Sequence, residues 1–129
     1  MEQSNGMLWF VLDDRSQANL RSSCPAQFPR AFGDHATLRF DVPLSAAYEK
    51  LVGKPHTIEV YEHCWNNRVQ AVRVRTNGLP DQYGVPHVTV SAVGEPFESV
   101  AMLKGSHHSE PLSLTLNGTV KFIPLKSRR

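Results

Sequence analysis

The chain has 129 residues, of which 40% are hydrophobic, and its 14 Lys and Arg exceed its 12 Asp and Glu for a formal net charge of +2. This length predicts one compact domain with a real core. So small a net charge is compatible with an anionic ligand but too weak to indicate a protein that wraps duplex DNA, so we expect no duplex DNA partner. No run approaches the roughly 20 apolar residues that a membrane helix needs.

The cysteine count adds to these limits. Cys24 and Cys64 are too few for a disulfide framework, and neither a Cys-x-x-Cys nor a His-Glu-x-x-His pattern occurs. We therefore expect two reduced thiols in a cytoplasmic protein, with no membrane partner, no metal and no cofactor. His107-His108 lies in a predicted turn, either simply exposed or able to bind adventitious metal.

Residues 7–12 are an apolar, β-rich run that predicts a core strand. Residues 13–34 predict a long loop, with a short helix over 16–20 at most. Loops of this length in small domains are often functional. The arginines of this segment, among them Arg30, are either solvated or within reach of a bound phosphate.

Residues 35–42 alternate regularly, with polar residues at odd positions and apolar residues at even ones. This period of two predicts a strand that buries Ala36 and Leu38. His35, Thr37 and Arg39 then lie on the opposite face. One His-x-Thr in a strand is weak evidence of function, because strands favour Thr and tolerate His.

The motif occurs twice. His87-Val88-Thr89-Val90 repeats His35-Ala36-Thr37-Leu38 at an offset of 52, which Leu103 and Gly105 share with Leu51 and Gly53. Each copy predicts a strand, a short helix that ends at Gly, and a second strand. We therefore predict a single domain over 1–129 with two pseudo-repeats, about 35–75 and 87–123.

The remaining elements follow from the same signals. Residues 57–63 and 69–75 predict a hairpin. Residues 111–116 predict the second strand of the second copy, and 115–123 a closing strand or a hairpin around Asn117-Gly118. Residues 76–86 predict a loop that leads into His87. Its Tyr83 either stacks on a nucleobase or packs on the domain.

A pseudo-two-fold would bring two imidazoles and two hydroxyls to one groove. Phosphodiester cleavage needs a base for the attacking water, an acid for the leaving oxygen, and donors for the phosphoryl oxygens. Histidine suits both proton transfers because its pKa lies near neutrality. The pattern predicts a metal-independent phosphodiesterase.

On these motifs the chain resembles the two-histidine phosphoesterase superfamily, and residues 86–122 also resemble the cyclic-phosphodiesterase-like domains of tRNA ligase-type RNA repair proteins. The resemblance implies a bilobal, duplicated α+β fold with antiparallel sheets flanking a central groove and short helices outside. It implies a catalytic pair, His35 and His87, and a phosphate-binding pair, Thr37 and Thr89.

The expected ligand is an RNA end or a small cyclic or 2′-linked nucleotide, bound by a monomer. Tyr83, Arg30 and Arg39 are candidate substrate-binding residues. The alternative is an RNA- or cyclic-nucleotide-binding module of the same fold without turnover. A matched pair of proton-transfer groups favours the enzyme, because a pure binder has little need for it.

Overall fold

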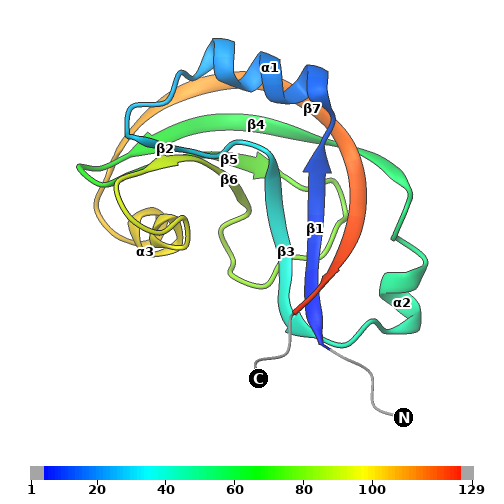
Figure 1. Ribbon diagram of the computed structural model, residues 1–129. Helices are drawn as coiled ribbons and strands as arrows, with labels where there is room; N and C mark the ends of the chain where they lie inside the picture. The colour runs from blue at the N-terminus through cyan, green and yellow to red at the C-terminus, as the bar shows by residue number, and fades with distance from the viewer. Residues whose placement is uncertain (1–4, 126–129) are drawn as a thin grey trace.

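The computed structural model describes residues 5–125 and has an α+β architecture, with one seven-stranded antiparallel sheet and three short helices in that range (Figure 1). The strands are β1 (Gly6–Leu12), β2 (Arg30–Ala31), β3 (His35–Val42), β4 (Pro55–Trp65), β5 (Val69–Arg75), β6 (His87–Ala92) and β7 (His108–Pro124). The helices are α1 (Asp14–Ser23), α2 (Ala46–Glu49) and α3 (Glu98–Lys104).

The prediction of two sheets flanking a groove is wrong, since the strands form one continuous sheet in the order β2-β6-β5-β4-β7-β1-β3. The reason is the long pairing of β4 with β7, which runs from Pro55 opposite Thr119 to Trp65 opposite His108 and joins the two halves. None of the helices between residues 5 and 125 has the length and apolarity that a membrane crossing requires.

The order of the strands has an internal symmetry. The units β3-α2-β4 and β6-α3-β7 have the same element order, as the sequence repeat predicts. Exchanging β3 with β6, β4 with β7 and β5 with β1 turns the order β6-β5-β4-β7-β1-β3 into its reverse. The two His-x-Thr strands therefore occupy equivalent positions toward opposite ends of the sheet.

The main core lies on one face of this curved sheet. Alternate residues of six strands are buried there, together with Leu20 of α1 and Cys24, which follows α1 directly.

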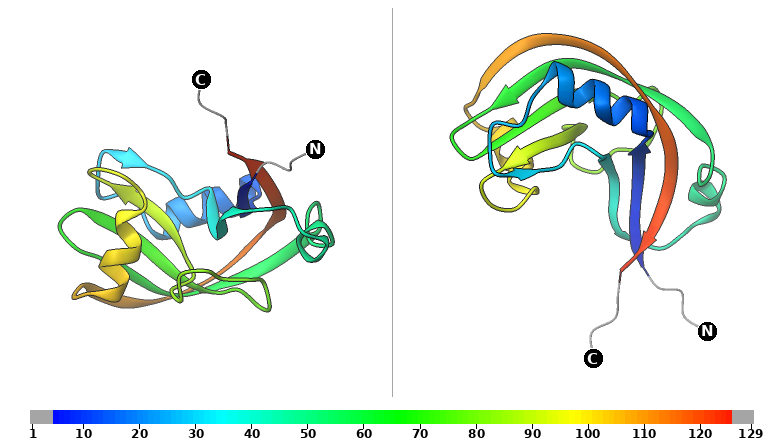
Figure 2. Two further views of the ribbon diagram at one scale, coloured as in Figure 1. Left: turned by 90° about the horizontal axis from the view of Figure 1, so that it is seen from below. Right: turned by 45° about the horizontal axis from the view of Figure 1, so that its top comes forward.

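Asp13 caps α1 by accepting a hydrogen bond from Ser16 N at 2.7 Å. The helix is longer than the predicted 16–20, and Figure 2 shows it lying within the arc of β7, β4 and β1. The predicted strands in β1 and β3 are confirmed.

The segment that follows α1 connects the two ends of the sheet. β2 pairs with β6, and beyond it Phe32 N and Gly33 N donate to Val90 O and Thr89 O, both at 2.8 Å. Leu12 N then donates to Asp34 O at 2.9 Å, which returns the chain to β1 at the start of β3. This segment brings β3 and β6 into contact although four other strands separate them in the sheet order.

A buried glutamine holds this segment in place. Gln70 Oε1 accepts from Gln27 N at 3.0 Å and from Ser91 Oγ at 2.6 Å, and Gln70 Nε2 donates to Pro25 O at 3.0 Å. Gln70 and Ser91 are both fully buried. Because buried polar groups need partners, these bonds fix the path of the chain from α1 to β2.

Two predicted details differ from the structure. Phe40 is 44% exposed and Asp41 has a φ of 58°, so the alternation predicted over residues 35–42 ends before the strand does. Of the two alternatives for residues 115–123, the strand is right and the hairpin is wrong. Asn117-Gly118 lies inside β7, where a Cβ on Gly118 would collide with Val11 O.

A second, smaller core lies on the opposite face, where α3 covers β5 and β6 (Figure 1). It contains Met102 and Leu103 of α3 with Val69, Ala71 and Cys64 of the sheet. The two cysteines belong to different cores and neither is in a disulfide, which confirms the predicted free thiols.

Candidate functional site

His35 begins β3 on the face opposite the main core, since its neighbour Ala36 is buried in that core. Its ring stacks on Trp9 of β1 with a centroid separation of 3.6 Å. Its Nδ1 lies 2.9 Å from Asp34 Oδ1, an acceptor that keeps the proton on Nδ1. The ring is therefore oriented from two sides, and Nε2 is the nitrogen left for a ligand.

His87 begins β6 and is half-buried. Its Nδ1 donates to Val85 O at 2.6 Å, and its Nε2 lies 2.8 Å from Ser99 Oγ. Ser99 Oγ is also 2.9 Å from Thr89 Oγ1. The two polar residues of the second motif are thus joined through one buried hydroxyl of α3, which sequence reasoning did not identify.

The hydroxyl of Ser99 serves both protonation states of His87. When the ring is neutral, Nε2 accepts the Ser99 proton. When the ring is protonated, Nε2–H donates to Ser99 Oγ, and the Ser99 proton turns to Pro96 O at 2.8 Å. His87 can therefore gain or lose a proton without leaving a buried partner unsatisfied.

The two imidazoles are electrostatically coupled. Burial is the main cause that lowers the pKa of His87 below 6.5, and the positive charges of His35 and Arg73 lower it further. The hydrogen bond to Val85 O and the carboxylate of Asp81 act in the opposite direction. This coupling agrees with the bridge through residues 32–34, which brings the start of β3 beside β6.

Arg73 is a second residue near His87 that the sequence motifs did not identify. It lies opposite His87 in the β5–β6 pairing, and its side chain is only 25% exposed. Its guanidinium also lies 3.7 Å from Glu62 Oε1. The strand alternation places it on the same face as His87, and only the pairing register reveals that the two are neighbours.

The three candidate substrate-binding residues have other contacts. Arg30 Nη1 donates to Gly94 O at 2.9 Å and to Glu95 at 3.2 Å. Tyr83 packs against the second core. Arg39 lies beside a bulge in the β1–β3 pairing, with its guanidinium 6.0 Å from the ring centre of Tyr48 on α2. The structure does not join these residues to the His87–Ser99–Thr89 network.

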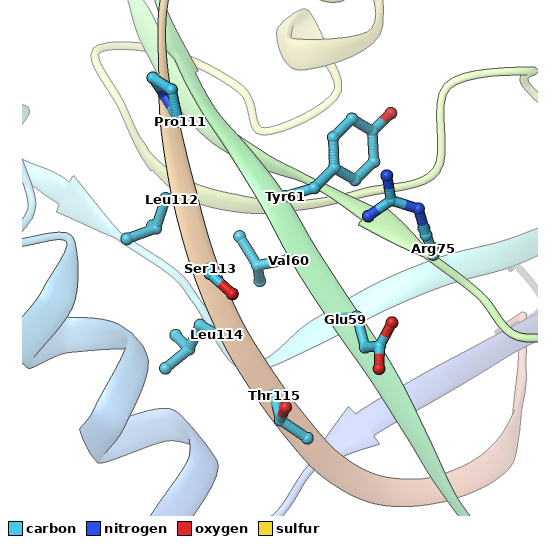
Figure 3. Close-up of a pocket in the computed structure, with 9 residues that line it drawn as sticks. All are labelled: Glu59, Val60, Tyr61, Arg75, Pro111, Leu112, Ser113, Leu114 and Thr115. Carbon is cyan, nitrogen blue, oxygen red and sulfur yellow. The ribbon is translucent and has the colours of Figure 1, made fainter.

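A separate depression of about 370 Å³ opens where β4 bulges away from β7 (Figure 3). Figure 3 shows Tyr61 and Arg75 on one side of it, and the Arg75 guanidinium lies 4.4 Å from the Tyr61 ring centre. Ser113 and Thr115 line the β7 side. None of the four candidate catalytic and phosphate-binding residues lines this depression.

Comparison with known proteins adds no family to this description. No protein-family model matches the chain, and no curated protein matches it.

Proposed function

We propose that the chain is a metal-independent phosphodiesterase with a duplicated two-histidine phosphoesterase fold, acting on a cyclic phosphate or a 2′-linked phosphodiester of RNA or a nucleotide. The observation that carries the proposal is the approach of the two His-x-Thr strands from opposite ends of the sheet, with His35 close enough to His87 to lower its pKa. The symmetric strand order is the support for a duplicated fold.

In this proposal the two imidazoles exchange protons with opposite sides of the phosphorus. His87 fits the role of base, because a lowered pKa keeps the ring neutral at pH 7. It takes a proton from the attacking water while His35 gives one to the leaving ribose oxygen. Thr37 and Thr89 donate to the phosphoryl oxygens, and the charge of Arg73 offsets the negative charge that develops there.

The test is a panel of substrates incubated with the protein in chelator, with products identified by mass. The panel contains a 2′,3′-cyclic nucleotide, a 2′,5′-oligoadenylate, ADP-ribose cyclic phosphate and a cyclic oligonucleotide. We expect turnover of at least one, with His35→Ala and His87→Ala each lowering the rate by about 100-fold or more.

His108→Ala is the matched control, since His108 is exposed and belongs to neither motif. Equal turnover by the His35, His87 and His108 variants would show that the activity comes from elsewhere.

A nucleotide-binding module without turnover is the second candidate. Its support is that the Ser99 hydroxyl is hydrogen-bonded to both His87 Nε2 and Thr89 Oγ1. This candidate predicts stoichiometric binding of a cyclic nucleotide and no product after long incubation. Under the enzymatic proposal, the phosphate displaces these bonds and product accumulates.

A further inference from the structure

Three side chains of types that can bind metals gather beside α3, outside both His-x-Thr motifs. Glu62 and Cys64 are two residues apart on β4, and His107 comes from the turn between α3 and β7. One donor atom from each residue lies within 4.8 Å of the other two. Carboxylate oxygen, thiolate sulfur and imidazole nitrogen at such separations are the donors that Zn²⁺ binds in proteins.

The imidazole is already oriented for binding. His107 Nδ1 donates to Gly105 O at 3.0 Å, which leaves the lone pair on Nε2. Histidines that bind metals commonly hold the second ring nitrogen in this way, on a backbone carbonyl or a carboxylate. Gly105 follows the last residue of α3, so the end of that helix positions the ring.

The sheet fixes the other two donors. Cys64 is fully buried, and its Sγ donates to Glu62 Oε1 at 3.4 Å. Arg73 lies opposite Glu62, and its Nη1 is 3.7 Å from the same carboxylate oxygen. One thiolate and one carboxylate would balance the charge of a divalent cation, and the Glu62 side chain is 30% exposed, which gives the ion a route from solvent.

We propose that Glu62, Cys64 and His107 form a binding site for a zinc-like divalent cation, with water as the fourth ligand. The ion would tie the α3–β7 turn to β4. The three ligands lie outside both His-x-Thr motifs, although Glu62 pairs with Arg73, which also lies opposite His87.

The test is titration of the chelator-treated full chain with Co²⁺, followed by competition with Zn²⁺. Cobalt bound to a thiolate absorbs in the near ultraviolet, and tetrahedral cobalt absorbs in the visible. We expect one Co²⁺ per chain, displaced by Zn²⁺, and an affinity at least about 10-fold lower in Cys64→Ser and in His107→Ala. A thermal melt of each variant without metal checks that it folds.

His108→Ala is the matched control, because His108 is adjacent in sequence but is not one of the three donors. It should bind Co²⁺ like the parent chain. Two results would overturn the proposal: a parent chain without the thiolate absorption band, or equal weakening by His107→Ala and His108→Ala with Cys64→Ser unaffected, which would identify an adventitious ion on the histidine pair. Because substrate is not used, this outcome is separate from that of the phosphodiesterase assay.

Discussion

Ser99 is the residue on which the second motif depends most directly. Its hydroxyl contacts His87 Nε2, Thr89 Oγ1 and Pro96 O at 2.8, 2.9 and 2.8 Å. We predict that Ser99→Ala lowers kcat about 10-fold, because one hydrogen bond to a charged group stabilises by about that factor. The same substitution should shift the acidic limb of the kcat–pH profile. Ser99→Thr, which keeps the hydroxyl, should restore the position of that limb. A loss of rate with an unshifted profile would assign Ser99 a purely structural role.

His87 also predicts a dependence of stability on pH. Burial is the main cause that lowers the pKa of His87 in the folded chain below 6.5. Just below pH 6.5 the unfolded chain therefore binds a proton that the folded chain does not bind. Stability is therefore lost as the pH falls from 6.5 toward the folded pKa. We predict that His87→Gln flattens this part of the profile in thermal melts between about pH 5 and 7.5. Parallel profiles for the two proteins would contradict this prediction.

At the scale of elements, the segment from α1 to β2 depends on one side chain of β5. Gln70→Ala would remove the donor to Pro25 O and the acceptor of the Ser91 hydroxyl, and Gln27 N would keep only Ser91 Oγ, at 3.2 Å. We predict a loss of about 3 kcal/mol in the free energy of unfolding, measured by urea denaturation. Gln27→Ala is the control, because its exposed side chain can be removed while its backbone keeps the bond to Gln70. Similar losses in both variants would contradict the role of Gln70.

At the scale of the whole molecule, the pairing of β1 with β7 completes the second half of the sheet. Gly118 lies opposite Leu12, and a Cβ there would collide with Val11 O and lie 2.9 Å from Val11 C. We predict that Gly118→Ala lowers the Tm by about 10 °C or more, since the backbone of β1 must shift. Gly53→Ala is the comparison: it has a φ of 84° but open space, so it should cost only about 1 kcal/mol. If Gly118→Ala were as stable as Gly53→Ala, then β1 and β7 could move apart at little cost in free energy, which would contradict this prediction.

Local patterns predicted the elements better than they predicted the contacts between them. The alternation of residues 35–42 marked β3 within its true bounds, because side chains on the two faces of a strand meet different surroundings. The same reasoning failed at Asn117-Gly118, which has the composition of a turn. Its glycine is required instead by the close approach of β1.

In the same way, the sequence identified some residues of the candidate site and missed others. The repeated motif identified His35, Thr37, His87 and Thr89 as candidates, but nothing near them in the sequence marks Ser99 or Arg73. Those two residues become neighbours of His87 through the packing of α3 and the register of β5 with β6. The position of a residue in the sequence does not show which residues of other elements it contacts.

By itself, the sequence determined the positions of β1, β3, β6 and the β4–β5 hairpin, and that the His-x-Thr motif occurs twice, because these follow from spacing along the chain. Only the tertiary structure decided that the two halves make a single sheet, that residues 30–34 bring its ends together, and that Glu62 and Cys64 meet His107. These are long-range contacts, and they depend on how the whole chain closes around its core.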